Sequence, residues 1–370
     1  MVMTNRRQFI RNILIAGAGV MILPDLRHDR GVFGAAPLRW LDHEADDPWA
    51  QVPEILRRIK PPVFPKRDFD ITRYGALGDG RTSCTEAFRK AIAACNNAGG
   101  GRVLVPRGAF LTGAIHLKSN VNLHVSQGAT IKFSTNPLEY LPPVFTRFEG
   151  TECMNYSPFV YSFEQENIAI TGQGTLDGSA SDENWWAWAR RRPGGSDALA
   201  RADMTRLKEL AERGVAVAER IFGERHYLRP NFIQPYRSKN VLIEGVRIIN
   251  SPMWEIHPVL CTNVTIANVN INSHGPNNDG CDPESCSDVL IKNCDFNTGD
   301  DCIAIKSGRN ADGRRLHVPS QNIVIQECRM RDGHGGVTIG SEISGGVRNV
   351  FAENCRMDSP QLDHGLRGGG

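Results

Sequence analysis

The sequence predicts an all-β fold of the solenoid type, a parallel β-helix, and two observations lead to it. The first is an internal repeat, in which short β-branched apolar runs, each opened by Asn or Asp, recur at intervals of 23 to 34 residues. The second is a composition rich in glycine, at 37 of 370 residues, and poor in aromatics, at 7%. A repeat of this period with strand-type alternation indicates a solenoid, because one repeat cannot bury its own apolar face and must stack on its neighbours.

The repeats share one anchor position, occupied by Asn or Asp. Its members are Asn167, Asn240, Asn263, Asp288, Asn322 and Asn349. Cys294, Cys328 and Cys355 each follow their own anchor by six residues. We therefore expect these cysteines to stack as a row of small apolar side chains in the core. One disulfide within the row is the alternative.

The N-terminus reads as an export signal. Paired Arg6 and Arg7 precede an apolar stretch of signal-peptide length, too short to span a membrane. This pattern resembles a twin-arginine signal, which carries folded cargo; the alternative is a chance arginine pair before a buried apolar segment. We therefore expect residues 1–35 to be a signal, residues 36–67 an N-terminal extension and residues 68–370 the β-helix.

Residues 69–106 read as strand, loop, helix and strand. The helix is predicted to start with a capping box formed by Ser83 and Glu86 and to stop at the glycines 99–101. Its apolar face contains Phe88, Ala91, Ile92 and Cys95. Such a helix is expected to cap the N-terminal end of the stack, whose edge would otherwise be exposed.

Residues 179–228 break the repeat and predict a long excursion from one coil, with a helical pattern that continues to Phe222. Excursions of this kind commonly form substrate walls. Trp185, Trp186 and Trp188 lie at its start, and we interpret them as packing residues rather than as a surface that stacks on sugars. Arg229 is interpreted as shaping the corner where the solenoid resumes, whereas Trp254 and His257 fit the core or a cleft equally well.

Three acidic residues fall on the predicted turns of consecutive coils. Asp279 follows one strand, and Asp300 and Asp301 follow the next, 21 residues or about one coil later. His334, between two glycines, follows the equivalent strand of the coil after that. Each acid alone would be an ordinary turn residue, but three acids and a histidine in register predict a site on one lateral face.

Clustered carboxylates suit glycoside hydrolysis. One carboxyl must stay protonated so that it can donate a proton to the leaving oxygen, and like-charged neighbours raise the pKa of this carboxyl. The other carboxylates hold the attacking water. If water attacks directly, with inversion, the acid and the base are expected to stand about 6.5 to 9.5 Å apart.

The segments PNND (276–279), GDD (299–301) and GHG (333–335), with SPMWEIHP (251–258) upstream, resemble the motifs of glycoside hydrolase family 28, the polygalacturonases and their relatives. The resemblance implies a right-handed parallel β-helix. It also implies metal-independent, cofactor-independent hydrolysis of α-1,4-galacturonide bonds in pectin, with inversion.

Position by position, the resemblance implies Asp300 as the general acid, with Asp279 and Asp301 as the pair that activates water. His334 corresponds to the histidine that supports the acid. Asn277 and Arg367 are implied as substrate-binding residues.

The sequence departs from the family pattern at two places. Asn278 stands where the family has Thr, and we expect this polar replacement to keep the loop. The family also has a later Arg-x-Lys motif: Arg367 matches its arginine, but Gly369 stands at the position of the lysine, so Arg367 is either a substrate ligand or a solvated terminal residue. The resemblance implies further coils, and we therefore expect the chain as written to be poorly stable, inactive or both.

The formal net charge of +2 argues against nucleic acid or a membrane surface as the partner. We expect a monomer, exported to the periplasm or the outside of a bacterial cell, that acts on pectic polysaccharide or oligogalacturonide of the plant cell wall, at chain ends if the excursion and residues 308–320 close the cleft. One alternative is a Ca²⁺-dependent pectate lyase on the same fold, in which the acids would hold the ion. The other is a catalytically impaired, truncated homologue that only binds pectic carbohydrate.

Overall fold

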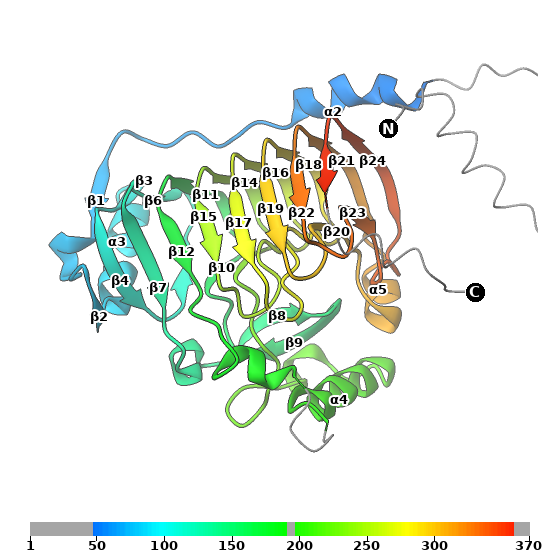
Figure 1. Cartoon of the computed structure of the whole chain (residues 1–370), viewed down its shortest axis with the longest axis horizontal. Coiled ribbons are helices and arrows are strands. Elements are labelled where there is room, and N and C mark those ends of the chain that lie inside the picture. Colours follow the sequence, from blue (N-terminus) through cyan, green and yellow to red (C-terminus); the bar gives the residue numbers. More distant parts are fainter. Residues whose placement is uncertain (1–46, 191–196, 359–370) are drawn as a thin grey trace, which may run out of the picture. The chain divides into compact units, whose positions relative to one another are not determined.

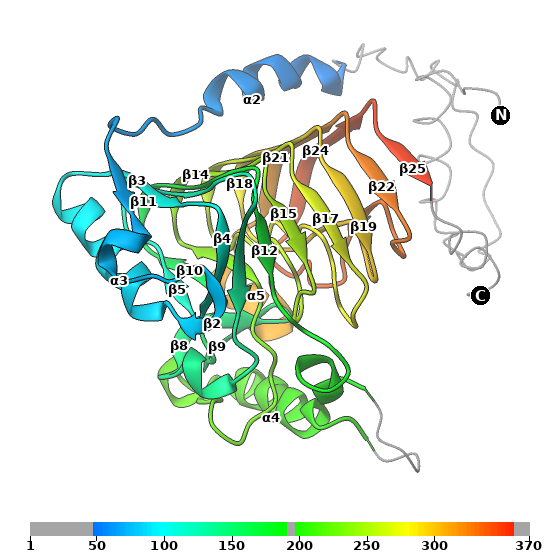
Figure 2. The ribbon, with the colours of Figure 1, turned by 60° about the vertical axis from the view of Figure 1, so that its left-hand side comes forward.

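The computed structural model describes residues 47–190 and 197–358, and it confirms the right-handed parallel β-helix (Figure 1). Two long parallel sheets run the length of the described solenoid (Figure 2). The strands of the first are, in order, β1 (Asp68–Asp70), β3 (Gly101–Val105), β6 (Val121–Val125), β11 (Glu166–Gly172), β14 (Lys239–Glu244), β16 (Thr262–Ala267), β18 (Ser287–Lys292), β21 (Ser320–Gln326) and β24 (Val347–Glu353). Those of the second are β2 (Asp79–Ser83), β4 (Gly108–Thr112), β7 (Ala129–Phe133), β12 (Thr175–Asp177), β15 (Arg247–Ile249), β17 (Asn270–Ser273), β19 (Asp295–Thr298), β22 (Arg329–Arg331) and β25 (Arg356–Asp358).

A third, shorter side completes each coil. It contains β5 (Ile115–His116), β10 (Val160–Phe163) and β13 (Ile233–Tyr236), and later β20 (Ile303–Ile305) and β23 (Val337–Ile339). Single parallel bridges through Ile256 and Cys281 connect the two groups. An antiparallel hairpin, β8 (Val144–Phe148) and β9 (Thr151–Asn155), stands apart from these sheets.

Helices are few and short. The α-helices are α2 (Val52–Arg58), α3 (Thr85–Asn97), α4 (Ala200–Glu212) and α5 (Asn310–Leu316), and the 3-10 turns are η1 (Pro48–Gln51), η2 (Ile71–Tyr74), η3 (Pro137–Tyr140), η4 (Trp185–Trp188) and η5 (Val217–Glu219). None of these described helices is long and apolar enough to span a lipid bilayer. The predicted signal, with Arg6 and Arg7, lies outside the described residues.

The interior is filled by rows of apolar side chains that the strand register stacks from coil to coil. One row contains Val103, Leu123, Ile170, Ile243, Ile266, Ile291 and Ile325, all buried. A second contains Phe110, Ile131, Leu176, Ile248, Ile271, Phe296 and Met330, also buried. Each such side chain contributes about 1.5–3 kcal/mol by leaving water, so the rows supply the main stabilisation of the fold.

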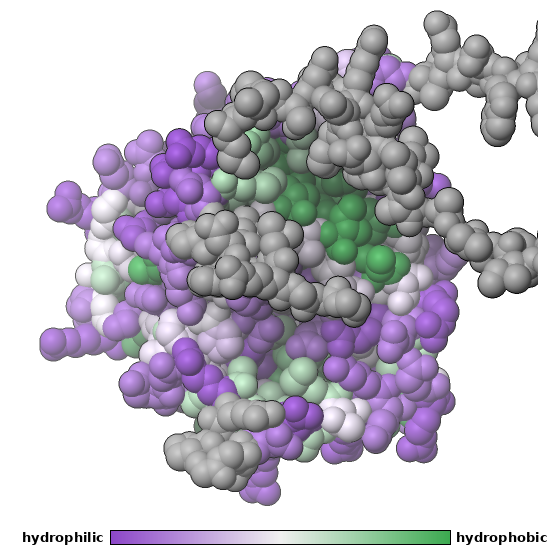
Figure 3. Space-filling view, turned by 45° about the vertical axis from the view of Figure 1, so that its right-hand side comes forward, coloured by the Kyte–Doolittle hydropathy of each residue, from purple (hydrophilic) through white to green (hydrophobic). Residues whose placement is uncertain are grey.

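Met357 continues the second row but is 49% exposed. Ile339 and Ile343, also close to the last described strands, are 55% and 43% exposed. Apolar side chains gather on the surface seen in Figure 3.

The cysteine row is confirmed. Cys294 and Cys328 are buried and Cys355 is half-buried, and neighbouring thiols of the row contact one another. All ten cysteines of the chain are free thiols, so the alternative of a disulfide within the row is not found. The thiols donate weakly to backbone carbonyls of their own and the preceding coil, as Cys328 does to Gln326 and Ile291.

The anchor position of the repeat forms a ladder of side-chain amides on the outside of the coils. Nδ2 of Asn167 donates to Oδ1 of Asn120, and Asn240 and Asn263 continue the series at 2.8 and 2.7 Å. Asn349 donates to Asn322 in the same way. All of these residues have φ between 53° and 64°, a left-handed conformation that Asn tolerates better than most residues. The anchor position of the repeat is therefore a turn position, where Asn tolerates the left-handed backbone and its amide bonds to the neighbouring coils.

Asp288 interrupts this amide ladder, because a carboxylate has no N–H to donate. The N-terminal strap, residues 48–66, occupies the break. Arg58 forms a two-pronged ion pair with Asp288, with Nη2 to Oδ1 at 2.6 Å, and Lys60 exchanges two backbone hydrogen bonds with the side chain of Asn263. Apolar residues of α2 pack on Val324 and Phe351, so α2 lies against the outer face of the first sheet (Figures 1 and 2).

Helix α3 lies at the N-terminal end of the stack, and the predicted apolar face is confirmed: Phe88, Ala91, Ile92 and Cys95 are buried. The predicted capping box is wrong. Cys84 occupies the N-cap and makes no capping bond through its side chain, whereas Glu86 pairs with Arg89. Strand β2 continues through Ser83, which moves the helix start one residue beyond the expected position.

The excursion contains η4, α4 and η5. The helical pattern was predicted to run to Phe222, but α4 ends at Glu212 because Gly214 takes φ +69°. Helix α4 meets α5, where Glu212 accepts from the backbone N–H of Ala311 and lies 3.8 Å from Arg314. Two segments that leave the solenoid a hundred residues apart thus form one wall.

Replacing Asn240 by Ala should lower the free energy of unfolding by about 2–4 kcal/mol. The substitution removes one rung of the amide ladder: Asn167 Oδ1 loses the donor Asn240, and Asn263 Nδ2 keeps only its bond to the Lys60 carbonyl. It also places Ala in a left-handed conformation. Denaturant unfolding followed by circular dichroism measures the change. Lys239→Ala, at the exposed neighbouring position, is the matched control and should cost less than about 0.5 kcal/mol; equal losses for the two variants would contradict a structural role of the ladder.

Candidate active site

The predicted acids lie together on one lateral face of the β-helix. Strands β17 and β19 pair in register, so the turns that follow them, with Asp279 on one and Asp300 and Asp301 on the other, are adjacent. One carboxylate oxygen of each acid lies within 4.8 Å of those of the other two. The acids lie this close because a residue in register lies one strand spacing, about 4.8 Å, from its counterpart.

His334, on the following coil, contacts Asp300 twice. Its Nδ1 lies 3.2 Å from Asp300 Oδ1, and its backbone N–H donates to the Asp300 carbonyl at 3.2 Å. The Asp300 side chain is 27% exposed and the histidine 60% exposed. Asp300 Oδ1 also accepts the backbone N–H of Asp301, so one oxygen of this carboxyl is held by the protein.

Asp279 is the deepest of the three acids, with a side chain only 5% exposed. Its Oδ1 has no hydrogen-bond partner within the described part of the chain. Burial raises the pKa of Asp279 well above its usual range, and repulsion from Asp282 and Asp300 adds to this, whereas the Lys306 ammonium opposes it.

Asp301 lies at intermediate depth. Burial raises the pKa of Asp301, and the hydroxyl of Thr338, which donates to the carboxylate, acts against this. Repulsion from Asp300 raises the pKa further, whereas Lys306 and His334 lower it. The carboxyls of Asp279 and Asp301 thus bind protons more readily than fully exposed ones.

Close backbone packing holds these turns. Asn278 is fully buried: its Oδ1 accepts from the Ser273 hydroxyl and the Gly275 N–H, and its Nδ2 donates to two carbonyls of the preceding coil. Asn at this position therefore keeps the loop, as expected. At Gly299 a Cβ would approach backbone atoms of the neighbouring turn to 2.8 Å, so only glycine allows the two turns this close.

Asn277, a predicted substrate ligand, is oriented by Arg229. Arg229 Nη2 donates to Asn277 Oδ1 at 2.6 Å, while Nη1 donates to the carbonyls of Pro252 and Pro276. The interpretation of Arg229 as a corner residue fits these contacts, but its effect on the Asn277 amide was missed. Burial lowers the pKa of Arg229 to about 10, which still leaves it charged at neutral pH. Arg367, the other predicted ligand, lies outside the described residues.

The three tryptophans pack, as interpreted from the sequence. Trp185 is 1% exposed and contacts Trp188 edge-on, with 4.8 Å between the ring centroids. Trp188 also contacts Tyr227, and Nε1 of Trp186 donates to the carbonyl of Ser251.

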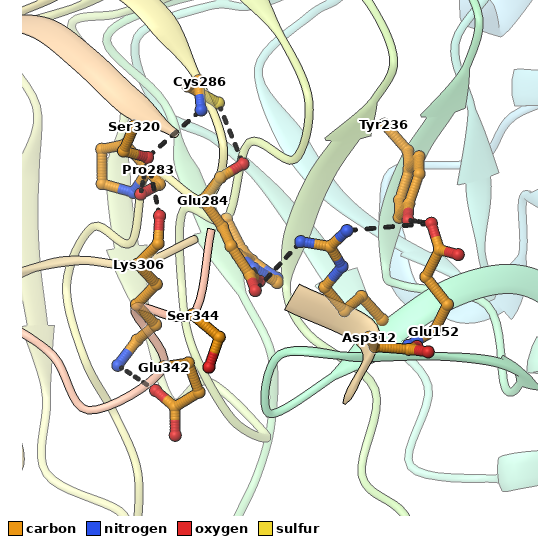
Figure 4. A network of polar contacts seen from close by, with 12 residues as sticks. Glu152, Tyr236, Pro283, Glu284, Cys286, Lys306, Asp312, Ser320, Glu342 and Ser344 are labelled. Carbon is orange, nitrogen blue, oxygen red and sulfur yellow. Dashed lines mark hydrogen bonds and ion pairs between the residues drawn. The ribbon is translucent and has the colours of Figure 1, made fainter. Parts of the chain in front are cut away.

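Behind the acids lies a buried polar layer between the third side of the solenoid and the β8–β9 hairpin. His257 and Trp254, left open by the sequence, both belong to it: His257 Nε2 lies 2.7 Å from Glu284, and Trp254 packs on His257. Arg147 from the hairpin contacts Glu284 at 3.0 Å and Glu152 at 3.7 Å. Figure 4 shows the two glutamates within this layer.

Sequence reasoning missed most of this layer, including Asp282 and Lys306. The available signal was alternation: in CDPE (281–284) and IAIK (303–306), every second residue is charged or small and so points away from the apolar interior.

Carboxylate oxygens are suitable ligands for hard cations, and the three acids form a group from which such an ion could take ligands. We assign no metal to them, because the protein supplies a positive charge of its own: Lys306 Nζ lies 3.9 Å from Asp279 Oδ2.

Comparisons with known proteins agree with this geometry. The model of the family described as glycosyl hydrolases family 28 matches residues 223–367, which include the acid-bearing coils. The crystal structure of a hyperthermoactive exopolygalacturonase from Thermotoga maritima is 55% identical, with a TM-score of 0.80, over 83% of this chain and 70% of that one.

Two curated relatives are more distant. A probable polygalacturonase of Vitis vinifera is 30% identical, over 77% of this chain and 53% of the relative. An exo-poly-alpha-D-galacturonosidase of Dickeya chrysanthemi is 31% identical, over 80% and 51%. The chain thus spans about half the length of the curated relatives it matches. The extent and identity of the structural match, together with the family model over the coils that carry the acids, show that the chain belongs to family 28 of the glycosyl hydrolases.

Proposed function

We propose that this chain is a glycoside hydrolase that cleaves α-1,4-galacturonide bonds in pectic polygalacturonan. The observation that carries the proposal is the convergence of Asp279, Asp300 and Asp301 on one face, with His334 on Asp300. The polygalacturonase and exopolygalacturonase names of the similar proteins support the substrate class. They do not support the lyase alternative.

In this proposal Asp300 is the general acid. It is accessible at the rim of the cluster, where its carboxyl can reach a glycosidic oxygen, and His334 holds one of its oxygens at 3.2 Å. Proton donation to the leaving oxygen then breaks the glycosidic bond without forming an alkoxide.

Asp279 and Asp301 receive the proton of the attacking water. Asp279 is more buried than Asp300. Burial raises the pKa of Asp279 and of Asp301, which makes each ionised carboxylate a stronger base. Asn277 is proposed to contact the sugar through Nδ2, since Arg229 already occupies its Oδ1.

We propose inversion at the anomeric carbon, because Asp279 and Asp301 can together activate one water that attacks opposite the acid. A specific observation favours the second candidate, retention. The oxygens lie within 4.8 Å of one another, near the carboxyl separation of about 5–5.5 Å of retaining enzymes and below the 6.5–9.5 Å usual in inverting ones.

We also propose that attack occurs at chain ends. Helices α4 and α5 contact each other through Glu212 and form one wall, which would close the cleft in one direction. The exo names of two similar proteins agree with this. Export from the cell, action as a monomer and Arg367 as a substrate ligand are further parts of the proposal, and they rest on the sequence pattern alone.

Asp300→Asn should reduce kcat on polygalacturonate by about 10²- to 10⁴-fold, because the amide has no proton to donate, while affinity for an oligogalacturonide stays close to that of the unsubstituted chain. Reducing-sugar release and isothermal calorimetry measure the two quantities. Asp332→Asn, at a half-exposed acid two residues before His334, is the matched control and should leave kcat unchanged. An undiminished rate in Asp300→Asn would refute the assignment of the acid.

Inversion predicts that the first reducing end formed from the α-linked substrate is the β-anomer. Proton NMR of a fresh digest, recorded before mutarotation equilibrates the anomers, separates the two mechanisms. The α-anomer appearing first would replace inversion by retention and leave the hydrolase proposal intact.

Exo action predicts one small product of constant size from a pentagalacturonide at every time point. Anion-exchange chromatography of the digest tests this. A mixture of intermediate lengths at early times would show internal attack and contradict the role given to the wall of α4 and α5.

A further inference from the structure

Lys306 places a positive charge beneath the acids, although no proposed catalytic step uses it. It follows β20, in which Ile303 and Ile305 point into the core. The side chain of Lys306 points to the other face, where it is 5% exposed. Its Nζ donates to the Gly340 carbonyl at 3.0 Å, pairs with Glu342 Oε2 at 3.1 Å (Figure 4) and lies 4.6 Å from the ring centroid of Trp254.

Four acidic side chains and one imidazole surround this ammonium group. The ammonium group interacts electrostatically with the carboxyls of Asp279, Asp282, Asp301 and Glu342. It also interacts electrostatically with the imidazole of His257. Asp282 is fully buried, and neither of its oxygens has a hydrogen-bond partner within residues 47–190 and 197–358. One cation therefore faces more negative charge than it can neutralise.

Glu342 is not the acid of this group that takes up a proton. Burial would raise its pKa, but Lys306 and Arg309 bring the pKa of Glu342 down to about 2. Asp282 has no hydrogen-bond partner among the described residues, and burial raises the pKa of Asp282 well above its usual range, with Lys306 opposing and Asp301 adding to the shift. Asp279 and Asp282 are therefore the two buried acids of the group that bind protons readily, and Lys306 opposes this at both.

We propose that Lys306 is a positioning residue of the active site that acts through Asp279, stabilising the negative charge of this carboxylate so that it can accept the proton of the attacking water. Its Nζ lies 3.9 Å from Asp279 Oδ2, so this oxygen faces the cation. Oδ1 is buried and has no hydrogen-bond partner among the described residues. The inference rests on the proposed hydrolysis and extends it to a residue that does not touch the substrate.

The sign of the effect follows from electrostatics. Although burial would lower the pKa of Lys306, Asp282, Glu342 and Asp279 raise it, so the ammonium stays charged at every working pH. An opposite charge within about 4–6 Å lowers a carboxyl pKa by about 1–3 units. Removing Lys306 must then raise the pKa of Asp279 and move the acidic limb of kcat/KM to higher pH.

The test measures protonation directly as well as turnover. In chains labelled with ¹³Cγ-aspartate, the Asp279 signal is assigned by its loss in Asp279→Asn and titrated by NMR. Lys306→Met should raise the titration midpoint by about 1–3 units and move the acidic limb of kcat/KM by a similar amount. Lys306→Arg, which keeps the charge, should stay within about half a unit of the unsubstituted chain.

Lys306→Met removes one of the two cations that pair with Glu342 and leaves Arg309, so the variant is expected to be less stable. The double variant Lys306→Met, Glu342→Gln removes the charges of both residues and should show the same upward shift, because Lys306 is the cation that lowers the pKa of Asp279. Lys292→Met, an exposed lysine paired with Glu327, is the matched control and should shift neither quantity.

The two levels of the proposal fail differently. An unchanged Asp279 midpoint in Lys306→Met and in the double variant would overturn the role of Lys306, whatever the rate. A shifted midpoint in a chain that hydrolyses no galacturonide bond would keep the electrostatic role and refute the proposed function instead.

Discussion

Hydrogen bonding between successive coils is the constraint on which the rest of the structure depends. It fixes the register of the parallel strands, so that residues at equivalent positions lie about 4.8 Å apart along the stack. The same rule arranges aliphatic residues from Val103 to Ile325 in one interior row and amides from Asn120 to Asn263 in one exterior ladder. It also brings the turn with Asp279 against the turn with Asp300. Core, surface and site are thus three consequences of one repeat distance.

Stacking favours identical neighbours only where the side chains attract one another or at least do not repel one another. Asparagine meets this condition, because its amide both donates and accepts. A carboxylate does not, and the fold supplies a cation where an acid enters a row: Arg58 at Asp288 in the amide ladder, and Lys306 beneath Asp279 in the cluster of acids. The first pair is partly exposed and holds the strap to the solenoid. The second is buried, where weaker screening makes the charge more effective.

Sequence reasoning reached those features that the repeat itself encodes. The anchors, the cysteine row and the adjacency of the acids follow from counting residues between equivalent positions. The capping box failed, because β2 extends through Ser83 and shifts the helix start. The adjacency of the acids follows from the strand register, which places successive turns one strand spacing apart.

Arg229, Arg147 and Lys306 acquire their roles from partners on distant segments. Arg229 reaches Asn277 across 48 residues, and Arg147 reaches Glu284 from a hairpin outside the repeat. The sequence repeat does not relate such pairs to each other. Alternation shows only that a side chain such as that of Lys306 points away from the apolar core.

The buried polar layer behind the acids has a reason beyond stability. Apolar residues of similar volume between the solenoid and the hairpin would often be as stable or more so, since desolvating ions is costly. Such a layer would leave Asp279 and Asp282 in a medium of low polarity without a nearby cation, and both would hold their protons. The proposed mechanism requires an ionised carboxylate base within a few ångströms of a carboxyl that donates a proton. The layer supplies the cation that such a base requires, because Lys306 Nζ lies 3.9 Å from Asp279 Oδ2.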